Sequence, residues 1–291
     1  MDNNRIFNMI INNAQTVGNK KFAAIPLELL TVGEYQRVDF YNTSKVDYLT
    51  THFDNNLMDP LKVSPHQEEG MFYVVDGMHR LNAAKAKGTI TELECEILQH
   101  LSAIPRERLI QEADIFRSQN KGTDALTPAA VHTANLICGN QASIDLDNVV
   151  RKYKVMYKTN ALRGKCNPGV LTGFSRAMAV AKTYGVEMLD SIFYVLNRSM
   201  WQMESGGLGN YPISMLRNLF YYDPETMINL ELVTGILKEY SPKIFKAKAL
   251  ARYERRGDDV ACSLFLEDLV NEVLPLDMNV HVKYAVVPNV A

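Results

Sequence analysis

Cysteine is scarce in this chain, and no two cysteines form a Cys-x-x-Cys pair. The four that are present lie far apart, which argues against a disulfide scaffold and a zinc ribbon and indicates reduced thiols. Long apolar runs are also missing: none approaches the roughly 20 residues that a membrane helix needs. The chain does not open with a basic segment followed by an apolar core. We therefore expect a cytoplasmic protein that has no membrane partner.

Acidic residues are absent from residues 150–185, although the whole chain carries 33 of them. Residues 1–149 have 13 basic and 19 acidic residues and residues 186–291 have ten and 14, whereas this stretch has eight basic residues. Its aromatic side chains could stack on bases while its cations neutralise phosphates. We predict nucleic-acid binding by Arg151, Lys152, Lys154, Lys158, Arg163 and Lys165. The alternative is a solvated face balanced by acids elsewhere in the fold. A second basic stretch over 243–256 has the same two interpretations.

The most informative segment runs from Phe72 to Gly88. It combines an apolar strand over 72–75, a polar hinge over 76–80 and a short helix over 80–87 that ends at Gly88. Because a helix begins at this hinge, free backbone N–H groups and a partial positive charge favour an anion there. Arg80 can hold two phosphate oxygens in a fork, and His79 adds a donor. The hinge predicts a phosphate or nucleotide site. The alternative is a structural turn in which Asp76 caps the helix and Arg80 pairs with an acid.

Hydrophobic periodicity predicts an α+β domain followed by an all-α domain. Helices are expected over 44–57, 80–87 and 106–120, and strands over 60–63, 72–75 and 93–97. The first 25 or so residues are expected to form an arm or a short helix. Strand signals nearly vanish beyond residue 126, where Thr127-Pro128 and Asp223-Pro224 are typical helix starts. We therefore predict domains over 22–125 and 126–291, and leave open whether residues 281–291 form a strand or a tail.

Two further features are predicted to be unremarkable. Residues 205–210 are glycine-rich, but no Lys-Ser or Lys-Thr pair follows them as in a P-loop, so we expect a plain loop. The remaining histidines, among them His66 and His132, have no metal-ligand spacing and are expected to be ordinary polar positions.

The order of motifs resembles the N-terminal domain of the ParB/sulfiredoxin superfamily over residues 22–135. The resemblance rests on Pro26-Leu27, Tyr35-Gln36-Arg37, Pro60-Leu61-Lys62-Val63, Asp76-Gly77-Met78-His79-Arg80 and Phe116-Arg117-Ser118-Gln119-Asn120. It implies a small ParB/sulfiredoxin-like α/β domain that holds CTP or ATP, with Mg²⁺, at the hinge. It also implies a role in partition, replication or maintenance of a plasmid, phage or integrative element.

The resemblance assigns roles to individual residues. Gly77, His79 and Arg80 would lie at the phosphates, and Arg37 and Asn120 would make further nucleotide contacts. Asp76 would orient His79 or hold Mg²⁺, because a hard cation prefers carboxylate oxygen. Asp76 and His79 are accordingly the catalytic candidates.

The departures from the family pattern keep several functions open. Met78 stands where sulfiredoxins carry the reactive cysteine, so sulfiredoxin chemistry is not expected. The Gly-Glu-Arg-Arg hinge of partition proteins is absent, as is the helix-turn-helix pattern expected after residue 128. The hinge is closer to the serine-kinase form, in which Glu28 or Glu34 would be the base. Nucleotide hydrolysis, phosphotransfer to a small molecule, a nuclease and a protein-interaction module therefore remain alternatives. The expected partners are a nucleotide, DNA and, as an open alternative, a second copy of the chain.

Overall fold

The chain folds into two compact units, Met1–Gly139 and Asn140–Ala291, each described by itself. The structure, a computed structural model, describes residues 3–36, 43–54, 57–119, 129–158, 167–222, 229–275, 278–280 and 282. The sequence suggested domains over 22–125 and 126–291. The first unit also includes helix α1 (Asn3–Asn13) before residue 22 and helix α5 (His132–Ile137) after residue 125. The helix starts at Thr127-Pro128 and Asp223-Pro224 and most of the 281–291 segment lie outside the described residues.

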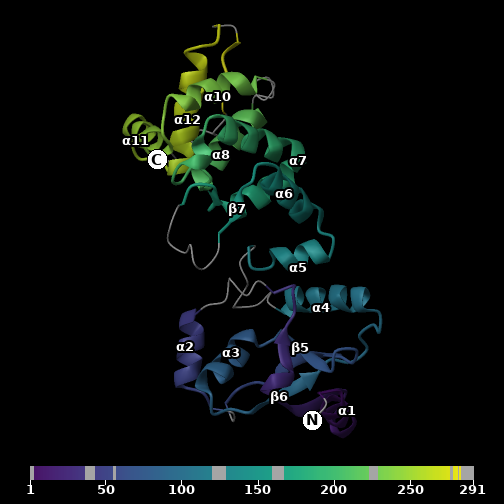
Figure 1. The fold of residues 1–291 in the computed structure, drawn as a ribbon. Helices are drawn as coiled ribbons and strands as arrows, with labels where there is room; N and C mark the ends of the chain where they lie inside the picture. The colour runs from purple at the N-terminus through teal and green to yellow at the C-terminus, as the bar shows by residue number, and fades with distance from the viewer. Residues whose placement is uncertain are drawn as a thin grey trace, which may run out of the picture. The chain divides into compact units, whose positions relative to one another are not determined.

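The first unit is built on a six-stranded mixed sheet, as the predicted α/β class requires (Figure 1). Its order is β1-β2-β6-β4-β5-β3, in which β4–β6 and β3–β5 are parallel and the other pairs are antiparallel. Its strands are β1 (Gln15–Val17), β2 (Lys20–Pro26), β3 (Leu30–Val32), β4 (Leu61–His66), β5 (Met71–Asp76) and β6 (Glu92–Ile97). The sequence analysis missed β1, β2 and β3; the 3-10 turn η1 (Leu27–Leu29) separates the last two.

Strand β5 has a hydrophobic core on each face because its side chains alternate in direction. Phe72 and Val74 pack with Leu81 of helix α3 (Met78–Lys87) and Val46 of helix α2 (Thr43–Thr51). Val75 belongs to a second cluster with Tyr35 and residues of helix α4 (Pro105–Gln119). The strand is therefore buried on both sides, as its apolar run predicts.

The predicted helices of the first unit form, with one difference in length. Helices α3 and α4 match the expected segments 80–87 and 106–120 to within two residues at each end that the structure describes. Helix α2 ends at Thr51 rather than at residue 57. The hydroxyls of Thr50 and Thr51 donate to the backbone carbonyls of Val46 and Asp47. Such side-chain bonds compete with the backbone hydrogen bonds of a helix, which favours its end here.

The second unit is helical, as predicted, with one small exception. Two-residue strands β7 (Met156–Tyr157) and β8 (Val170–Leu171) pair in parallel. Its helices are α6 (Gln141–Lys152), α7 (Phe174–Arg198), η4 (Trp201–Met203), α8 (Asn210–Tyr222), α10 (Leu230–Lys238), α11 (Pro242–Arg252) and α12 (Asp258–Asn271). The glycine-rich residues 205–209 form turns, as expected for a plain loop.

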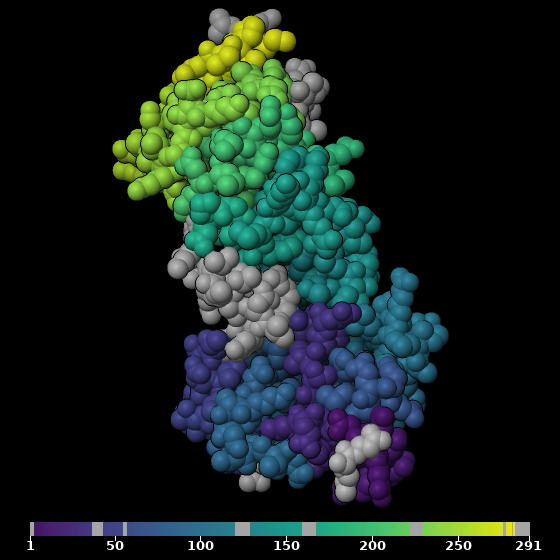
Figure 2. All heavy atoms as spheres, viewed as in Figure 1, coloured from purple at the N-terminus to yellow at the C-terminus, as the bar shows by residue number. Residues whose placement is uncertain are grey.

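Helix α11 lies at the outer surface of the second unit (Figure 2). Figure 1 shows it beside α12, against which it packs. Within the part of the chain that the structure describes, no helix combines the length and apolar character needed to cross a membrane.

Candidate functional site

Strand β5 passes into helix α3 through Gly77, in a backbone conformation that favours glycine. Gly77 has φ of 104° and ψ of 19° and is the N-cap of α3. A Cβ atom at this position would lie 2.9 Å from Leu61 Cγ and 3.0 Å from Arg80 Nη2. Both the left-handed backbone and the close neighbours therefore exclude a larger residue without a local shift.

The N-cap residue of α3 is a glycine and provides no side-chain cap. Gly77 has no side chain to accept from the first-turn amides, and the first turn contains no acidic residue. The amide groups of Met78, His79 and Arg80 precede Leu81, the first residue that bonds back to Gly77 O, at 3.0 Å. Such a terminus presents backbone donors and a partial positive charge, which suits an anion.

Arg80 ties the hinge to the segment that precedes β4. Its Nη1 donates to the carbonyls of Asp59 and Pro60, the latter at 3.2 Å, and its Nη2 donates to Asp76 Oδ2 at 3.1 Å. The pair with Asp76 is the contact that the structural alternative predicts for Arg80, although Asp76 does not cap the helix. Arg80 therefore positions the hinge in the described structure.

His79 is half-buried at the beginning of α3, and its surroundings favour the neutral imidazole. Burial is the main reason that the His79 pKa lies below its ordinary 6.5, and the charge of Lys45 lowers the pKa further, whereas Asp76 opposes both effects. Lys45 belongs to the first turn of α2, which packs beside α3. A basic side chain from a second helix is thus close to the beginning of α3.

Of the other three residues predicted for this site, the structure describes only Asp76. Arg37 and Asn120 lie outside the described residues. Asp76 keeps a partly exposed carboxylate whose Oδ2 is bonded to Arg80. One carboxylate, completed by phosphate oxygens and water, is a common environment for Mg²⁺, so Asp76 fits the role of a single protein ligand.

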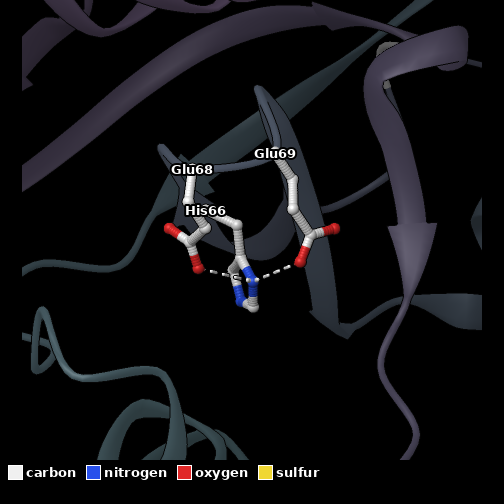
Figure 3. A group of neighbouring side chains, drawn as sticks. All are labelled: His66, Glu68 and Glu69. Carbon is white, nitrogen blue, oxygen red and sulfur yellow. Dashed lines mark ion pairs between the residues drawn. The ribbon is translucent and has the colours of Figure 1, made fainter.

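A second polar group, which the sequence analysis did not anticipate, surrounds His66 at the end of β4. Its Nδ1 faces Glu68 Oε1 and Glu69 Oε1, each at 3.8 Å (Figure 3). A histidine and two carboxylates at this separation could hold a metal ion. However, Arg108 Nη2 donates to Glu68 Oε1 and lies 3.4 Å from His66 Nδ1. The guanidinium therefore already supplies the positive charge between these groups, and we assign no metal to them.

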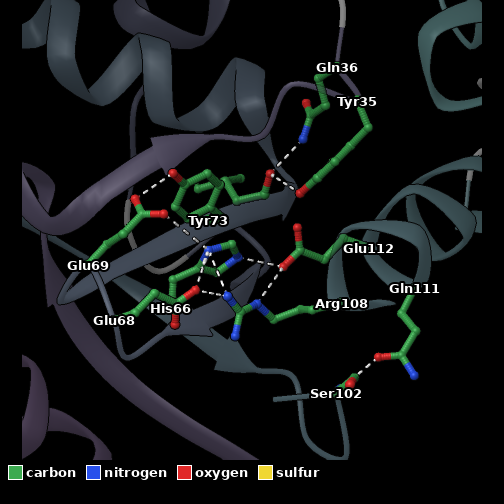
Figure 4. A network of polar contacts seen from close by, with 11 residues as sticks. Tyr35, Gln36, His66, Glu68, Glu69, Tyr73, Ser102, Arg108, Gln111 and Glu112 are labelled. Atoms are coloured by element: carbon green, nitrogen blue, oxygen red, sulfur yellow. Dashed lines mark hydrogen bonds and ion pairs between the residues drawn. The ribbon is translucent and has the colours of Figure 1, made fainter. Parts of the chain in front are cut away.

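Helix α4 completes this network with a fully buried carboxylate (Figure 4). Glu112 is 0% exposed and its Oε1 lies 2.7 Å from His66 Nε2. Tyr73 stacks on the His66 ring at 3.8 Å and donates to Glu69 Oε2 at 2.7 Å. That hydrogen bond is the main reason that the pKa of Tyr73 rises to about 12, so the phenol remains a donor at neutral pH. The network joins β4, β5 and α4.

The basic stretch predicted to bind nucleic acid is partly neutralised within the second unit. Arg151 pairs with Asp147 at 2.7 Å, and Lys152 pairs with Asp190 at 2.7 Å. Both acids lie outside the acid-free stretch, as the solvated-face alternative expects. Lys154 and Lys158 are described on the segment after α6, whereas Arg163 and Lys165 lie outside the described residues.

Solved structures that are similar to this chain include the following two. Both are ParB proteins. A Pnob8-like ParB-N domain is 13% identical, with a TM-score of 0.40, over 90% of this chain and 100% of that chain. The C-terminally truncated chromosome-partitioning protein ParB from Caulobacter crescentus, complexed with CTP-gamma-S, is 14% identical, with a TM-score of 0.24, over 84% of this chain and 98% of that chain. No protein-family model and no curated protein match the chain.

Proposed function

We propose that this protein is a ParB-like nucleotide-binding protein that holds CTP or ATP at the N-terminus of α3. Its role would be DNA-associated, in partition, replication or maintenance of a plasmid, phage or integrative element. The observation that carries the proposal is the beginning of α3, where Gly77 is the N-cap directly after a buried strand, the first turn has no acidic residue, and His79 and the charge of Lys45 lie close by. A cytoplasmic location fits the free thiols of Cys95, Cys138 and Cys262.

In this proposal the phosphates accept from the first-turn amides of α3. Three N–H groups in one turn, aligned with the helix dipole, form a concave set of donors for phosphate oxygens. His79 would add a ring N–H, and binding of the anion would favour its protonated form. Lys45 would supply charge without a fixed geometry, since an ammonium acts on phosphate as a point charge.

Arg80 and Asp76 would stabilise the hinge that forms the site. Arg80 binds the carbonyls of residues 59–60 and the Asp76 carboxylate at the same time, so it would hold Gly77 in its conformation at the start of α3. Direct contact of Arg80 with phosphate would require exchange of its bond to Asp76. The released carboxylate would then be free to bind the Mg²⁺ that accompanies a nucleoside triphosphate.

Phosphoryl transfer, including nucleotide hydrolysis, is a second candidate that one observation favours. Because the His79 pKa is lowered, the imidazole is neutral near pH 7 and is able to accept a proton from water or a hydroxyl. Glu28, in η1, and Glu34, which follows β3, are exposed and offer alternative bases. If His79 is the base, nucleotide turnover is lost in His79→Ala; if a glutamate is the base, turnover is lost in Glu28→Gln or Glu34→Gln instead.

The direct test is calorimetric titration of CTP, ATP and GTP, each with Mg²⁺, into the wild type, His79→Ala and Lys45→Ala. We expect one nucleotide to bind the wild type with a Kd in the micromolar range and both variants to bind it at least about tenfold more weakly, equivalent to about 1.4 kcal/mol. His52→Ala is the matched control, because His52 is an exposed histidine just beyond α2. No binding to the wild type, or full affinity in both site variants, would refute the proposal.

A further inference from the structure

Helix α11 begins immediately after a three-residue turn that follows α10. The turn consists of residues 239–241, and Ser241 caps α11 by accepting a hydrogen bond from Ile244 N at 3.3 Å. Pro242 occupies the first turn, and no acidic residue is present there. The helix therefore starts at a defined point, and its own first turn adds no negative charge to its positive end.

Aromatic side chains hold this turn in place. Trp201 Nε1 donates to Leu237 O at 2.9 Å and to Tyr240 O at 2.8 Å, and Tyr211 donates to Pro242 O at 2.6 Å. On the inner side of α11, Phe245 packs edge-to-face on Trp201 with ring centroids 5.3 Å apart. Trp201 and Phe245 are fully buried. The outer face of α11 is consequently presented by a rigid support.

That outer face is basic. Residues 241–257 contain six basic residues and one acidic residue. Lys246 and Arg252 pair with Asp258 and Asp268, at 2.5 and 2.8 Å. The other four cations are exposed and have no ion pair to an acid among the residues that the structure describes; they are Lys243, Lys248, Arg255 and Arg256.

Small side chains lie between these cations. Ala247 and Ala251 are exposed at spacings of four from Lys243, so the three share one face of the helix. Ile244, which is 53% exposed, adds an apolar contact beside them. Because the side chains between the cations are small, this face of the helix can approach a polyanion closely. An α-helix also fits the major groove of B-DNA.

We propose that α11 is a DNA-contacting helix of this protein, with Lys243 and Lys248 bound to phosphates of the duplex. The proposal rests on the DNA-associated role proposed above and names the surface that performs it. Two observations favour α11. Arg151 and Lys152, the cations of the first stretch that lie on a helix, pair with Asp147 and Asp190, whereas Lys243 and Lys248 have no ion pair among the described residues. Lys154 and Lys158 also have no ion pair among those residues, but they lie on the segment after α6 rather than on an exposed helix face. Lys248 Nζ lies 5.4 Å from the centroid of the Tyr240 ring, a contact that leaves its charge without a neutralising acid. Cations that have no ion pair release more counterions from DNA on binding than cations already paired with an acid.

The test measures binding of a labelled DNA duplex by fluorescence anisotropy between about 50 and 200 mM salt. The full-length wild type is compared with Lys243→Ala/Lys248→Ala and with the matched control Arg151→Ala/Lys152→Ala. Because loss of two phosphate contacts removes about two units from the slope of log K against log[salt], we expect the α11 variant to bind about tenfold or more weakly, with a shallower slope. The control should bind like the wild type.

Two further measurements, the melting temperature and the nucleotide affinity of the variants, show whether lost DNA binding comes from α11 itself. Lys243→Gln/Lys248→Gln retains polar side chains of helix-compatible length, and an unchanged melting temperature in either α11 variant excludes unfolding as the cause of lost binding. Nucleotide titration of the same variants should give wild-type affinity, so a failure at the hinge is distinguishable from a failure at α11. Wild-type DNA affinity in both α11 variants would overturn the proposal, as would binding of poly-glutamate in preference to DNA.

Discussion

Gly77 and Arg80 act together on the turn between β5 and α3. The glycine permits a left-handed backbone, and the arginine fills the space into which a side chain at residue 77 would project. The residues that resemble a ligand-binding motif are thus also the residues that fix the hinge. A variant of Arg80 changes both properties, which is why His79 and Lys45 are the better probes of ligand binding.

Replacement of Gly77 by alanine should destabilise the first unit by about 2–3 kcal/mol, because the backbone strain adds to the contact with Leu61 and Arg80. Gly88→Ala is the matched control: its φ is also positive, at 70°, but its Cβ would meet nothing within 4 Å. We expect a cost of about 1 kcal/mol there. Urea denaturation of both variants measures the difference, and equal costs would show that the crowding at Gly77 has no energetic effect.

His79 should make stability depend on pH in a defined direction. Its pKa is lowered in the folded state, so the unfolded chain takes up the proton first as the pH falls below about 6.5. The His79 contribution to stability is therefore complete above this pH and decreases as the pH falls toward the folded-state pKa. Thermal denaturation from neutral to acidic pH should show a smaller decrease in His79→Gln than in the wild type. The same decrease in both proteins would contradict the lowered pKa.

The buried network around His66 connects three elements and has a predictable energetic role. Arg108 is only 5% exposed, and Glu112 approaches both Arg108 Nε, at 3.9 Å, and His66. Removal of one member of a buried charged group leaves the others without compensation, which typically costs several kcal/mol. The network therefore stabilises the junction of β4, β5 and α4 only as long as it is complete.

We expect Glu112→Ala to lower the free energy of unfolding by about 3–5 kcal/mol, since it removes the carboxylate that both His66 and Arg108 face. The control is Lys20→Ala, which removes the surface ion pair of Lys20 with Glu96 (2.9 Å) and should cost less than about 1 kcal/mol. Chemical denaturation of the two variants distinguishes them. A Glu112 variant as stable as the Lys20 variant would argue against a stabilising network.

Periodicity was sufficient to predict most central elements but not the edges or the network. Strand β5 and helices α3 and α4 have continuous apolar signals, so they were predicted closely. Strand β2 was missed because Lys20–Pro26 is a short, polar-flanked run whose pairing with β6, some 70 residues later, supplies much of its order. His66 and Glu112 are 46 residues apart, and only the packing of α4 on the sheet brings them together. The sequence did not reveal the pairing of Lys152 with Asp190 for the same reason.

The division into two units separates the two proposed activities. The hinge, both core clusters of the sheet and the His66 network all lie within residues 1–139, whereas α11 lies in the second unit. Each unit has its own buried apolar residues, which is the usual condition for independent folding.

A fragment of residues 1–139 should therefore unfold cooperatively and bind nucleotide with the affinity of the full chain. Circular dichroism on heating tests the first expectation and calorimetry tests the second. DNA binding should be absent from this fragment at salt concentrations at which the full chain binds. A fragment without a cooperative transition, or one that retains full DNA affinity, would contradict this division of roles.

In the proposed function, nucleotide phosphates rest on the first turn of α3. The most direct measurement is the change in backbone amide ¹H–¹⁵N NMR shifts when CTP or ATP, with Mg²⁺, is added to the full chain. If the phosphates bind there, the amide shifts of Met78, His79 and Arg80 change most, and the change saturates at the affinity found by calorimetry. Binding that leaves these three amides unshifted, with the largest changes elsewhere, would contradict it.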